Sequence, residues 1–362
     1  MKRSRSSRLL AAAAVVLSLS AVLAGCSRAD SGDSGSNAAG GTTAADKGPA
    51  TELRLGYFPN ITHAPALIGL EKGLFTKELG STKLVPTKFN AGPEAVNALY
   101  GGSLDATFIG SGPSINAYGK SDGKAVRLVA GTASRGAQLV VKPDINSAQD
   151  LVGKTVVTPQ LGNTQDISLK KWLDQQKLTD QVKVQNTENS LALEEFKKGN
   201  VQGAWLPEPW SSRLVLEAGA KVLVDEKDLW PNGEFPTTVL IVSTTFLNDH
   251  PQTVKALLKG LVASVDYAKQ DVPGAKDAVN KQLKALTGKD LTGPTTDRAF
   301  ANLNFTLDPY AALLPQLSKD SVTAKISKTE TDVKGFLDLK LLNEVLAESG
   351  KPAVDAANLD KK

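Results

Sequence analysis

Apolar and polar positions follow two alternating periods along most of the chain. Short apolar runs with strand spacing occur at LRLGYF (53–58), LDATFIG (104–110), VRLVAGT (126–132) and QLVVKP (138–143). Segments with helical spacing lie between them, among them HAPALIGLEKGLF (63–75) and FNAGPEAVNALYGG (89–102). Strands that alternate with helices predict an α/β fold with parallel layers.

The same arrangement begins again after Pro143. Strands are expected at GKTVVTP (153–159), VKVQNT (182–187) and VQGAWLP (201–207), with helices between them. The segment from Ala95 aligns without gaps on the segment from Ala192, through either an internal repeat or shared strand-helix order. Both explanations predict two α/β lobes. Ligands of open α/β sheets bind beyond the carboxyl ends of the strands, which here are the loops 59–64, 110–114, 131–136, 158–165 and 207–211.

The last third of the chain has mostly helical spacing. FPTTVLIVST (235–244) predicts one more strand, and helices are expected at 251–270, 271–286 and 331–349. In the last of these, residues three and four apart form an apolar stripe of Val333, Phe336, Leu337, Leu341 and Val345. We expect these helices to complete a core.

The N-terminal segment has the pattern of a lipoprotein signal peptide. Basic residues in MKRSRSSR precede an apolar run and Leu23-Ala24-Gly25-Cys26. Residues 1–25 are therefore expected to be a signal peptide, with Cys26 as the lipidated residue, and the alternative is an ordinary secretory signal. Residues 26–50, rich in Ser, Gly and Ala, predict a flexible tether.

Net charge argues against nucleic-acid binding. The chain has 42 basic and 38 acidic residues, and four of the basic residues lie in the expected signal peptide. The remaining 38 basic residues equal the acidic ones, so the electrostatic basis of nucleic-acid binding is missing. Cys26 is the only cysteine, which leaves the part beyond it without a disulfide or a cysteine nucleophile.

Small polar residues stand where two helices are expected to begin. Gly162, Asn163 and Thr164 precede one helix, and Ser111, Gly112 and Ser114 lie at the start of another. A helix start has free N–H groups and a partial positive charge, so such residues can bind an oxyanion. Each of them could instead cap its own helix.

Two charged or titratable residues are further candidates. His63, in PNITHAP, lies at a helix start, where it could contact a ligand or make only a local polar contact. Arg135, in GTASRGAQ, could pair with a sulfonate through two hydrogen bonds or could be a solvated loop residue. His63 has no second His or Cys nearby at ligand spacing, so no metal site is expected.

Motifs for catalysis are missing from the sequence. It contains no G-x-S-x-G, no H-E-x-x-H and no phosphate-binding loop with a lysine. We therefore expect no enzymatic activity and no cofactor.

Six segments in order carry a resemblance over essentially the whole chain beyond the tether: GYFPNITHAPALIGLEKGLF, FNAGPEAVNAL, FIGSGPSINAY, TPQLGNTQDISLKKWL, LPEPWSSRLV and DLWPNGEFPTTVLIVS. The chain resembles the solute-binding proteins of ABC importers for aliphatic sulfonates, nitrate and taurine. The resemblance implies a two-lobed periplasmic-binding-protein fold of type II, with crossing segments near residues 140 and 236. It places the first lobe at 51–140, the second at 141–235, and the completion of the first lobe with C-terminal helices at 236–362.

The resemblance also adds candidate binding residues. Glu208 and Trp210, in PEPW, resemble the cleft loop of the second lobe, where Trp210 could cover an apolar part of the ligand. Phe58 lies at a strand end and Thr237 at the second crossing. Asn60 and Ser134 complete the candidates.

The expected function is capture of a small organic anion between the lobes and its delivery to an ABC permease. An aliphatic sulfonate is the preferred ligand, and nitrate, taurine or a thiamin-pyrimidine precursor are alternatives. A secreted enzyme on the same scaffold is the alternative from another class, although the cleft cysteine of such desulfinases is missing. We expect a monomer, anchored by lipid on the outer face of the cell membrane, or in the periplasm of a cell with two membranes.

Overall fold

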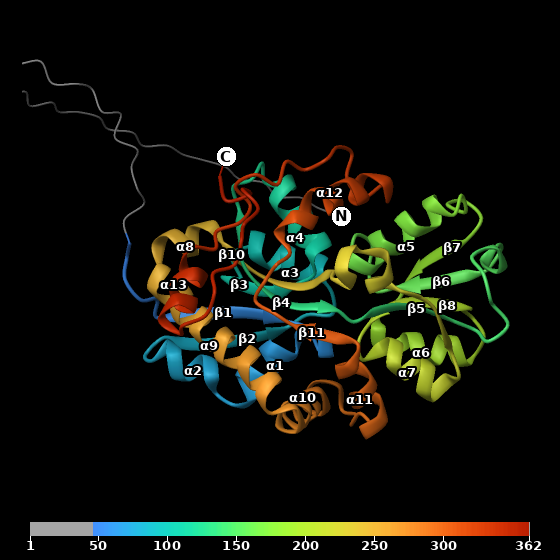
Figure 1. Cartoon of the computed structure of the whole chain (residues 1–362), viewed down its shortest axis with the longest axis horizontal. Coiled ribbons are helices and arrows are strands. Elements are labelled where there is room, and N and C mark those ends of the chain that lie inside the picture. The colour runs from blue at the N-terminus through green and yellow to red at the C-terminus, as the bar shows by residue number, and fades with distance from the viewer. Residues whose placement is uncertain (1–45, 362) are drawn as a thin grey trace, which may run out of the picture. The chain divides into compact units, whose positions relative to one another are not determined.

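The computed structural model describes residues 46–361, and these contain two β-sheets (Figure 1). The first sheet has the strand order β11-β4-β10-β3-β1-β2. Its strands are β1 (Glu52–Tyr57), β2 (Lys83–Lys88), β3 (Ala106–Ile109), β4 (Val126–Arg135), β10 (Pro236–Ser243) and β11 (Leu303–Phe305). β1 pairs in parallel with β2 and β3, whereas β10 runs antiparallel to β3 and β4.

The second sheet has the order β7-β6-β8-β5-β9. Its strands are β5 (Ala137–Val141), β6 (Thr155–Thr158), β7 (Lys183–Asn186), β8 (Gly203–Pro207) and β9 (Lys221–Asp225). β6 lies between β7 and β8 and is parallel to both, and β8 pairs with the antiparallel β5. In the first sheet, β1 likewise lies between β2 and β3, and β3 pairs with the antiparallel β10. The two halves that align in sequence therefore also share strand order.

The chain crosses between the sheets twice. β4 ends at Arg135 and β5 begins at Ala137, and Gly136 between them has a φ of 75° that suits glycine. The return runs from the end of β9 through residues 226–235 to β10. β5 already belongs to the second sheet, so the first crossing lies a few residues before the position near 140 implied by the resemblance.

Helices cover both faces of the first sheet. They are α1 (Ala64–Glu71), α2 (Leu74–Leu79), α3 (Gly92–Tyr100), α4 (Ser111–Lys120), α8 (Thr244–Asp249), α9 (Pro251–Gln270), α10 (Val272–Thr287), α11 (Gly293–Ala301), α12 (Leu314–Thr323) and α13 (Lys340–Glu348). α9 packs on α1, α2 and α13, and these elements share one apolar core with the sheet. α11 also contacts α7, and α12 contacts both α4 and α5, so the C-terminal helices reach the second lobe.

The second sheet has one apolar cluster on each face. Figure 1 shows α5 (Thr164–Gln175) on one face, and α6 (Asn189–Lys197) and α7 (Trp210–Ala218) on the other. Trp172 of α5 packs edge to face against Trp205 of β8, with ring centroids 6.3 Å apart. Phe196 of α6 belongs to the opposite cluster. Trp205 is thus a core residue.

Two segments differ from the sequence-based prediction. Residues 46–50 were assigned to the tether, but the Ala50 amide donates to Thr253 Oγ1 at 2.8 Å, and Lys47 pairs with Asp249. The folded part therefore begins before Thr51, and Cys26 with the rest of the tether lies outside the described residues. The helix expected at 331–349 covers only Lys340–Glu348, because Gly335 has a φ of 76° and residues 336–338 bond to Leu128 of β4 instead. The apolar stripe still contributes to the core.

Candidate functional site

Helix starts of the two lobes meet directly. α4 begins just after β3, and α5 begins six residues after β6 ends, so both starts lie beyond the carboxyl end of a parallel strand. The Gly112 amide donates to Thr164 Oγ1 at 3.3 Å, and the Gly92 amide of α3 donates to Asn163 Oδ1 at 3.3 Å. We call this contact between Gly92, Gly112, Asn163 and Thr164 the seam.

The polar side chains at the seam do not cap their own helices. Asn163 is the N-cap residue of α5 and makes no capping hydrogen bond, and Thr164 bonds across the seam. Ser111 is fully buried, and its hydroxyl has no partner among the described residues. Ser114 behaves differently, because its hydroxyl donates to the Ser111 carbonyl within the helix.

Two more helix starts carry buried polar atoms without a partner in the described chain. These atoms are Asn189 Oδ1 in the first turn of α6 and Ser211 Oγ in the first turn of α7. Buried polar atoms in native proteins are nearly always paired, so three such atoms at helix starts call for an explanation. Sequence reasoning missed Asn189 and Ser211, although the rule that singled out Ser111 would have found both.

A second set of contacts joins the lobes beside the seam. Trp210 Nε1 donates to Asn60 Oδ1 at 2.7 Å, and both side chains are buried. The Ile61 amide donates to the Glu208 carbonyl at 2.9 Å. The first bond pairs a candidate of the first lobe with a candidate of the second, and the other bond joins the neighbour of Asn60 to Glu208.

Asp166 fixes the loop that leads into α5. Its buried carboxylate accepts from the Gly162 amide at 2.9 Å and from Thr158 Oγ1 at 3.1 Å, and it pairs with Lys170 at 2.8 Å. Asp166 stands three residues after the N-cap Asn163, where an acidic residue typically reaches back to the start of the helix. This spacing was available in the sequence and was missed.

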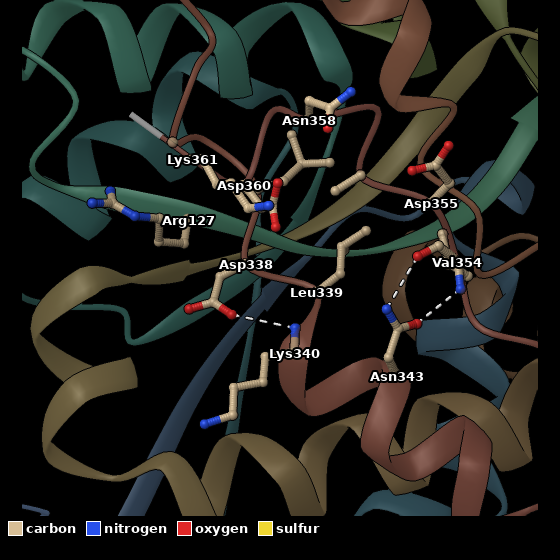
Figure 2. A pocket seen from close by; sticks show the side chains of 13 residues that line it. Arg127, Asp338, Leu339, Lys340, Asn343, Val354, Asp355, Asn358, Asp360 and Lys361 are labelled. Atoms are coloured by element: carbon tan, nitrogen blue, oxygen red, sulfur yellow. Dashed lines mark hydrogen bonds between the residues drawn. The ribbon is translucent and has the colours of Figure 1, made fainter.

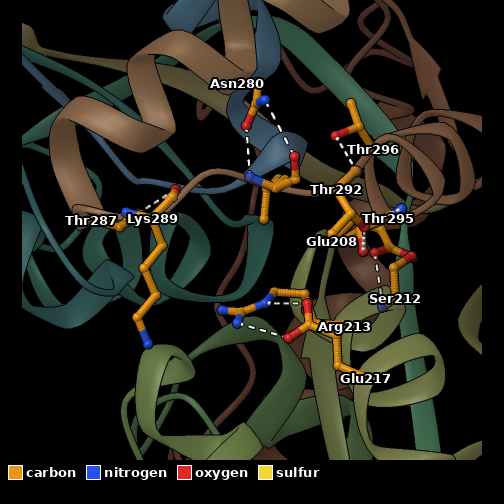
Figure 3. Close-up of polar contacts among 11 residues, drawn as sticks. Glu208, Ser212, Arg213, Glu217, Asn280, Thr287, Lys289, Thr292, Thr295 and Thr296 are labelled. Atoms are coloured by element: carbon orange, nitrogen blue, oxygen red, sulfur yellow. Dashed lines mark hydrogen bonds and ion pairs between the residues drawn. The ribbon is translucent and has the colours of Figure 1, made fainter.

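The Glu208 carboxylate is turned to the C-terminal helices. It is fully buried and accepts from Asn302 Nδ2 at 2.6 Å, Arg298 Nη1 at 3.2 Å and the Ser212 amide at 3.2 Å. Figure 3 shows Glu208 and Ser212 beside the separate pair of Arg213 and Glu217. The backbone of Glu208 is also hydrogen-bonded, to the Ile61 and Thr62 amides and to the Gly136 carbonyl. Arg298 and Asn302 lie too far along the chain for local patterns to predict them as partners.

Ser134, Arg135 and Thr237 lie at the two crossings. The Arg135 guanidinium pairs with Glu234, and Ser134 Oγ also donates to that carboxylate. Thr237 Oγ1 donates to the Arg135 carbonyl. Burial acts to raise the pKa of Glu234, but the hydrogen bonds from Ser134 and Arg135 outweigh it and hold the pKa below its usual value. In this conformation the three residues join the crossings to each other.

His63 is buried under Phe58. Their ring centroids are 4.4 Å apart, and the Phe58 amide donates to His63 Nδ1 at 3.3 Å. Burial lowers the pKa of the imidazole to about 3. His63 is therefore neutral at physiological pH and supplies no positive charge to an anion.

One pocket lies away from the candidate residues. It has a volume of about 600 Å³ and is lined by Arg127, Asp338, Lys340, Asp355 and others near the C-terminus (Figure 2). Charges of both signs line it, and none of the candidate binding residues is among its lining residues. Within residues 46–361, no group of three or more His, Cys, Asp and Glu could hold a metal ion. No helix in that range is long and apolar enough to cross a membrane.

Residues 46–284, more than half of the chain, match the NMT1-like family. The chain belongs to this family. The resemblance described from the sequence is thereby confirmed, and by family and fold this NMT1-like protein is a solute-binding protein of the class that serves ABC importers.

Individual relatives agree with this family. The chain is 29% identical over 282 residues to the taurine-binding periplasmic protein of Escherichia coli (strain K12), covering 75% of this chain and 82% of that one. It is 26% identical over 344 residues to the putative aliphatic sulfonates-binding protein of Bacillus subtilis (strain 168), covering 92% and 96%.

Among solved structures, the alkanesulfonate-binding protein SsuA of Xanthomonas axonopodis pv. citri, bound to MOPS, superimposes with a TM-score of 0.66. The two chains are 19% identical, and the match covers 80% of this chain and 98% of that one. The similarity confirms the predicted two-lobed periplasmic-binding-protein fold.

Proposed function

We propose that this protein is an extracytoplasmic receptor that captures an aliphatic sulfonate between its lobes and delivers it to an ABC permease. The observation that carries the proposal is the seam, where amides and short polar side chains from helix starts of both lobes face one another. The unpartnered Ser111 hydroxyl lies at the same helix start as Gly112.

These groups suit a small oxyanion. Amides at a helix start donate hydrogen bonds, and the helix dipole favours negative charge there. A sulfonate has three acceptor oxygens and one charge, and donors from two lobes can bind it from opposite sides. A hydrogen bond from an unpaired donor to a charged group contributes roughly 1.5–3 kcal/mol, and micromolar affinity requires about 8 kcal/mol.

Sulfonates are preferred over other oxyanions because the named relatives include taurine- and aliphatic-sulfonate-binding proteins. Nitrate and thiamin-pyrimidine precursors are the alternatives within the binding class. For entry of the ligand, the lobes part by motion at the crossings where Arg135 and Glu234 meet. We propose that Phe58, Asn60, His63, Glu208 and Trp210 shape this path and position the two lobes rather than carry charge.

The cellular setting is also part of the proposal. Lipidation of Cys26 would anchor the protein on the outer face of the cell membrane, or in the periplasm where two membranes are present. The protein acts as a monomer, without enzymatic activity. Loss of labelled-lipid incorporation in Cys26→Ala would support the anchor, and unchanged incorporation would contradict it.

Isothermal titration of the fragment 46–362 with ethanesulfonate, 1-propanesulfonate, taurine, nitrate and sulfate tests the ligand. We expect sulfonates to bind, with about a tenfold or greater loss of affinity in Ser111→Ala or Thr164→Ala, as loss of a hydrogen bond to a charged group implies. Ser264→Ala is the matched control, because Ser264 is equally buried but donates to the Gly260 carbonyl within α9. Binding of nitrate alone would refute the sulfonate assignment, and release of sulfite on incubation would refute the binding-only function.

A further inference from the structure

A second pocket lies beside the seam and is lined by both lobes. It has a volume of about 250 Å³. Its lining comes from α3 and α4 of the first lobe, the loop before α5, and the segment after α12: Pro93, Val96, Asn97, Tyr100, Pro113, Asn116, Ala117, Lys120, Leu161, Gly162, Lys325 and Ile326. We call it the side pocket.

The side pocket adjoins the proposed anion site. Pro113 follows Gly112 in the chain, and Gly162 precedes Asn163, so two lining residues are direct neighbours of seam residues. Consecutive Cα atoms are about 3.8 Å apart. The seam and the side pocket are therefore close enough for one small molecule to contact both.

Apolar surface is exposed at this pocket. Leu161 is 64% exposed, the highest value among the large exposed hydrophobic side chains of the described residues, and Tyr100 is 45% exposed. Val96, Pro113 and Ile326 add further apolar lining. Exposed apolar side chains that gather at one pocket are typical of a binding surface.

The charge of the side pocket has one sign. Lys120 and Lys325 line it, and neither forms an ion pair with any residue in 46–361. The twelve lining residues include neither Asp nor Glu. The pocket therefore attracts an anion and repels the ammonium group of an aminosulfonate. The pocket near the C-terminus differs, because acidic and basic side chains both line it (Figure 2).

We infer that the side pocket holds the uncharged apolar tail of the anion whose head group is bound at the seam. The inference rests on the proposed function and narrows its substrate class to alkane- or arenesulfonates with an apolar tail, in preference to taurine. The tail would contact Tyr100 and Leu161, which come from opposite lobes, and would therefore favour the closed conformation.

The first test measures affinity against chain length, by titrating ethane-, butane- and hexanesulfonate. Burial of a methylene contributes about fourfold in affinity, so we expect an increase of that size per added carbon until the pocket is filled. Leu161→Gln should flatten this dependence and leave ethanesulfonate binding unchanged. Leu216→Gln, at an exposed leucine of α7 outside the pocket, is the matched control.

The second test compares taurine with 1-propanesulfonate, which has nearly the same shape but lacks the ammonium group. We expect the wild type to prefer 1-propanesulfonate, and the double variant Lys120→Glu, Lys325→Glu to shift the ratio toward taurine by about three- to tenfold at low salt. Lys269→Glu, at an exposed lysine of α9, should leave the ratio unchanged.

The outcomes separate this inference from the proposed function. If short sulfonates bind but affinity is independent of chain length, the side pocket does not hold the tail, and the proposed function stands. A ratio of taurine to 1-propanesulfonate affinity that the double variant leaves unchanged would also overturn the inference. If no sulfonate binds, both the proposed function and the inference fail.

Discussion

Replacing Gly110 by alanine should keep the lobes from closing. Gly110 precedes α4 with a φ of −69° and a ψ of 152°, so alanine is compatible with its backbone. The added Cβ would overlap Thr164 Oγ1 of the second lobe and lie 3.3 Å from Thr164 Cβ. Thr164 is β-branched and therefore stiff, so the clash is relieved most easily by separating the lobes. Gly110→Ala thus acts on the closed conformation and leaves the fold of each lobe intact.

The size of the effect follows from the cost of overpacking, about 1–3 kcal/mol. If this cost falls only on the closed conformation, affinity for the ligand drops about 5- to 150-fold. Small-angle scattering of fragment 46–362 should show a larger radius of gyration, and titration should show the lost affinity. Gly293→Ala is the control, because a Cβ at Gly293 meets nothing within 4 Å.

Thr164 provides the second half of this experiment. In the Gly110→Ala background, Thr164→Ala removes the overlapping hydroxyl and should restore the smaller radius. The reasoning is refuted if Gly110→Ala matches Gly293→Ala in both radius and affinity. The seam would then not belong to the ligand-binding conformation.

Three further predictions concern stability and processing. Arg298→Ala leaves the buried Glu208 carboxylate without a charged partner, so it should lower the free energy of unfolding in urea by about 3 kcal/mol. Lys276→Ala breaks an exposed ion pair with Asp297 and should lower it by less than about 1 kcal/mol. Equal losses in the two variants would contradict a stabilising role of the buried pair. Burial raises the pKa of the Glu226 carboxyl to about 8, so the folded state binds more protons than the unfolded state between about pH 4.5 and 8. Stability should therefore be highest below this range and fall as pH rises through it, and Glu226→Gln should remove that slope; a slope unchanged in the variant would assign it to another group. Cys26→Ala should release the protein from membranes on cell fractionation, and retention in the membrane fraction would contradict a lipid anchor.

Local patterns predicted many of the elements and two α/β lobes, whereas the resemblance implied the type of fold. Strand spacing, small residues at helix starts and the order of the six motifs predicted two α/β lobes with ligand-facing loops, and the family match confirms the resemblance. The final helix was predicted too long because apolar spacing continues through residues 336–338, which bond to Leu128 of β4 and are not helical. Spacing identifies a buried face without showing that the backbone is helical throughout.

The partners of the candidate residues could not be predicted from local patterns. Arg135 was weighed as a ligand contact or a solvated residue, and its partner Glu234 lies 99 residues later in the chain. Asn60 and Trp210 are separated by 150 residues. Such pairs depend on how the crossings align the two sheets. A single sequence shows which side chains are polar, but it does not show which of them satisfy each other.

The seam also limits how strongly an anion can bind. The amides of Gly92 and Gly112 donate to the neutral oxygens of Asn163 and Thr164, so a sulfonate that takes these amides must displace those acceptors. The gain per amide is the difference between a charge-assisted hydrogen bond, roughly 1.5–3 kcal/mol, and a neutral one, roughly 0.5–1.5 kcal/mol. About 1 kcal/mol per amide remains, which is well short of the total that micromolar affinity requires. Donors whose partners are not already fixed, such as the Ser111 hydroxyl, and burial of an apolar tail must then supply the rest. A receptor built in this way should discriminate among sulfonates by their tails more than by their shared head group.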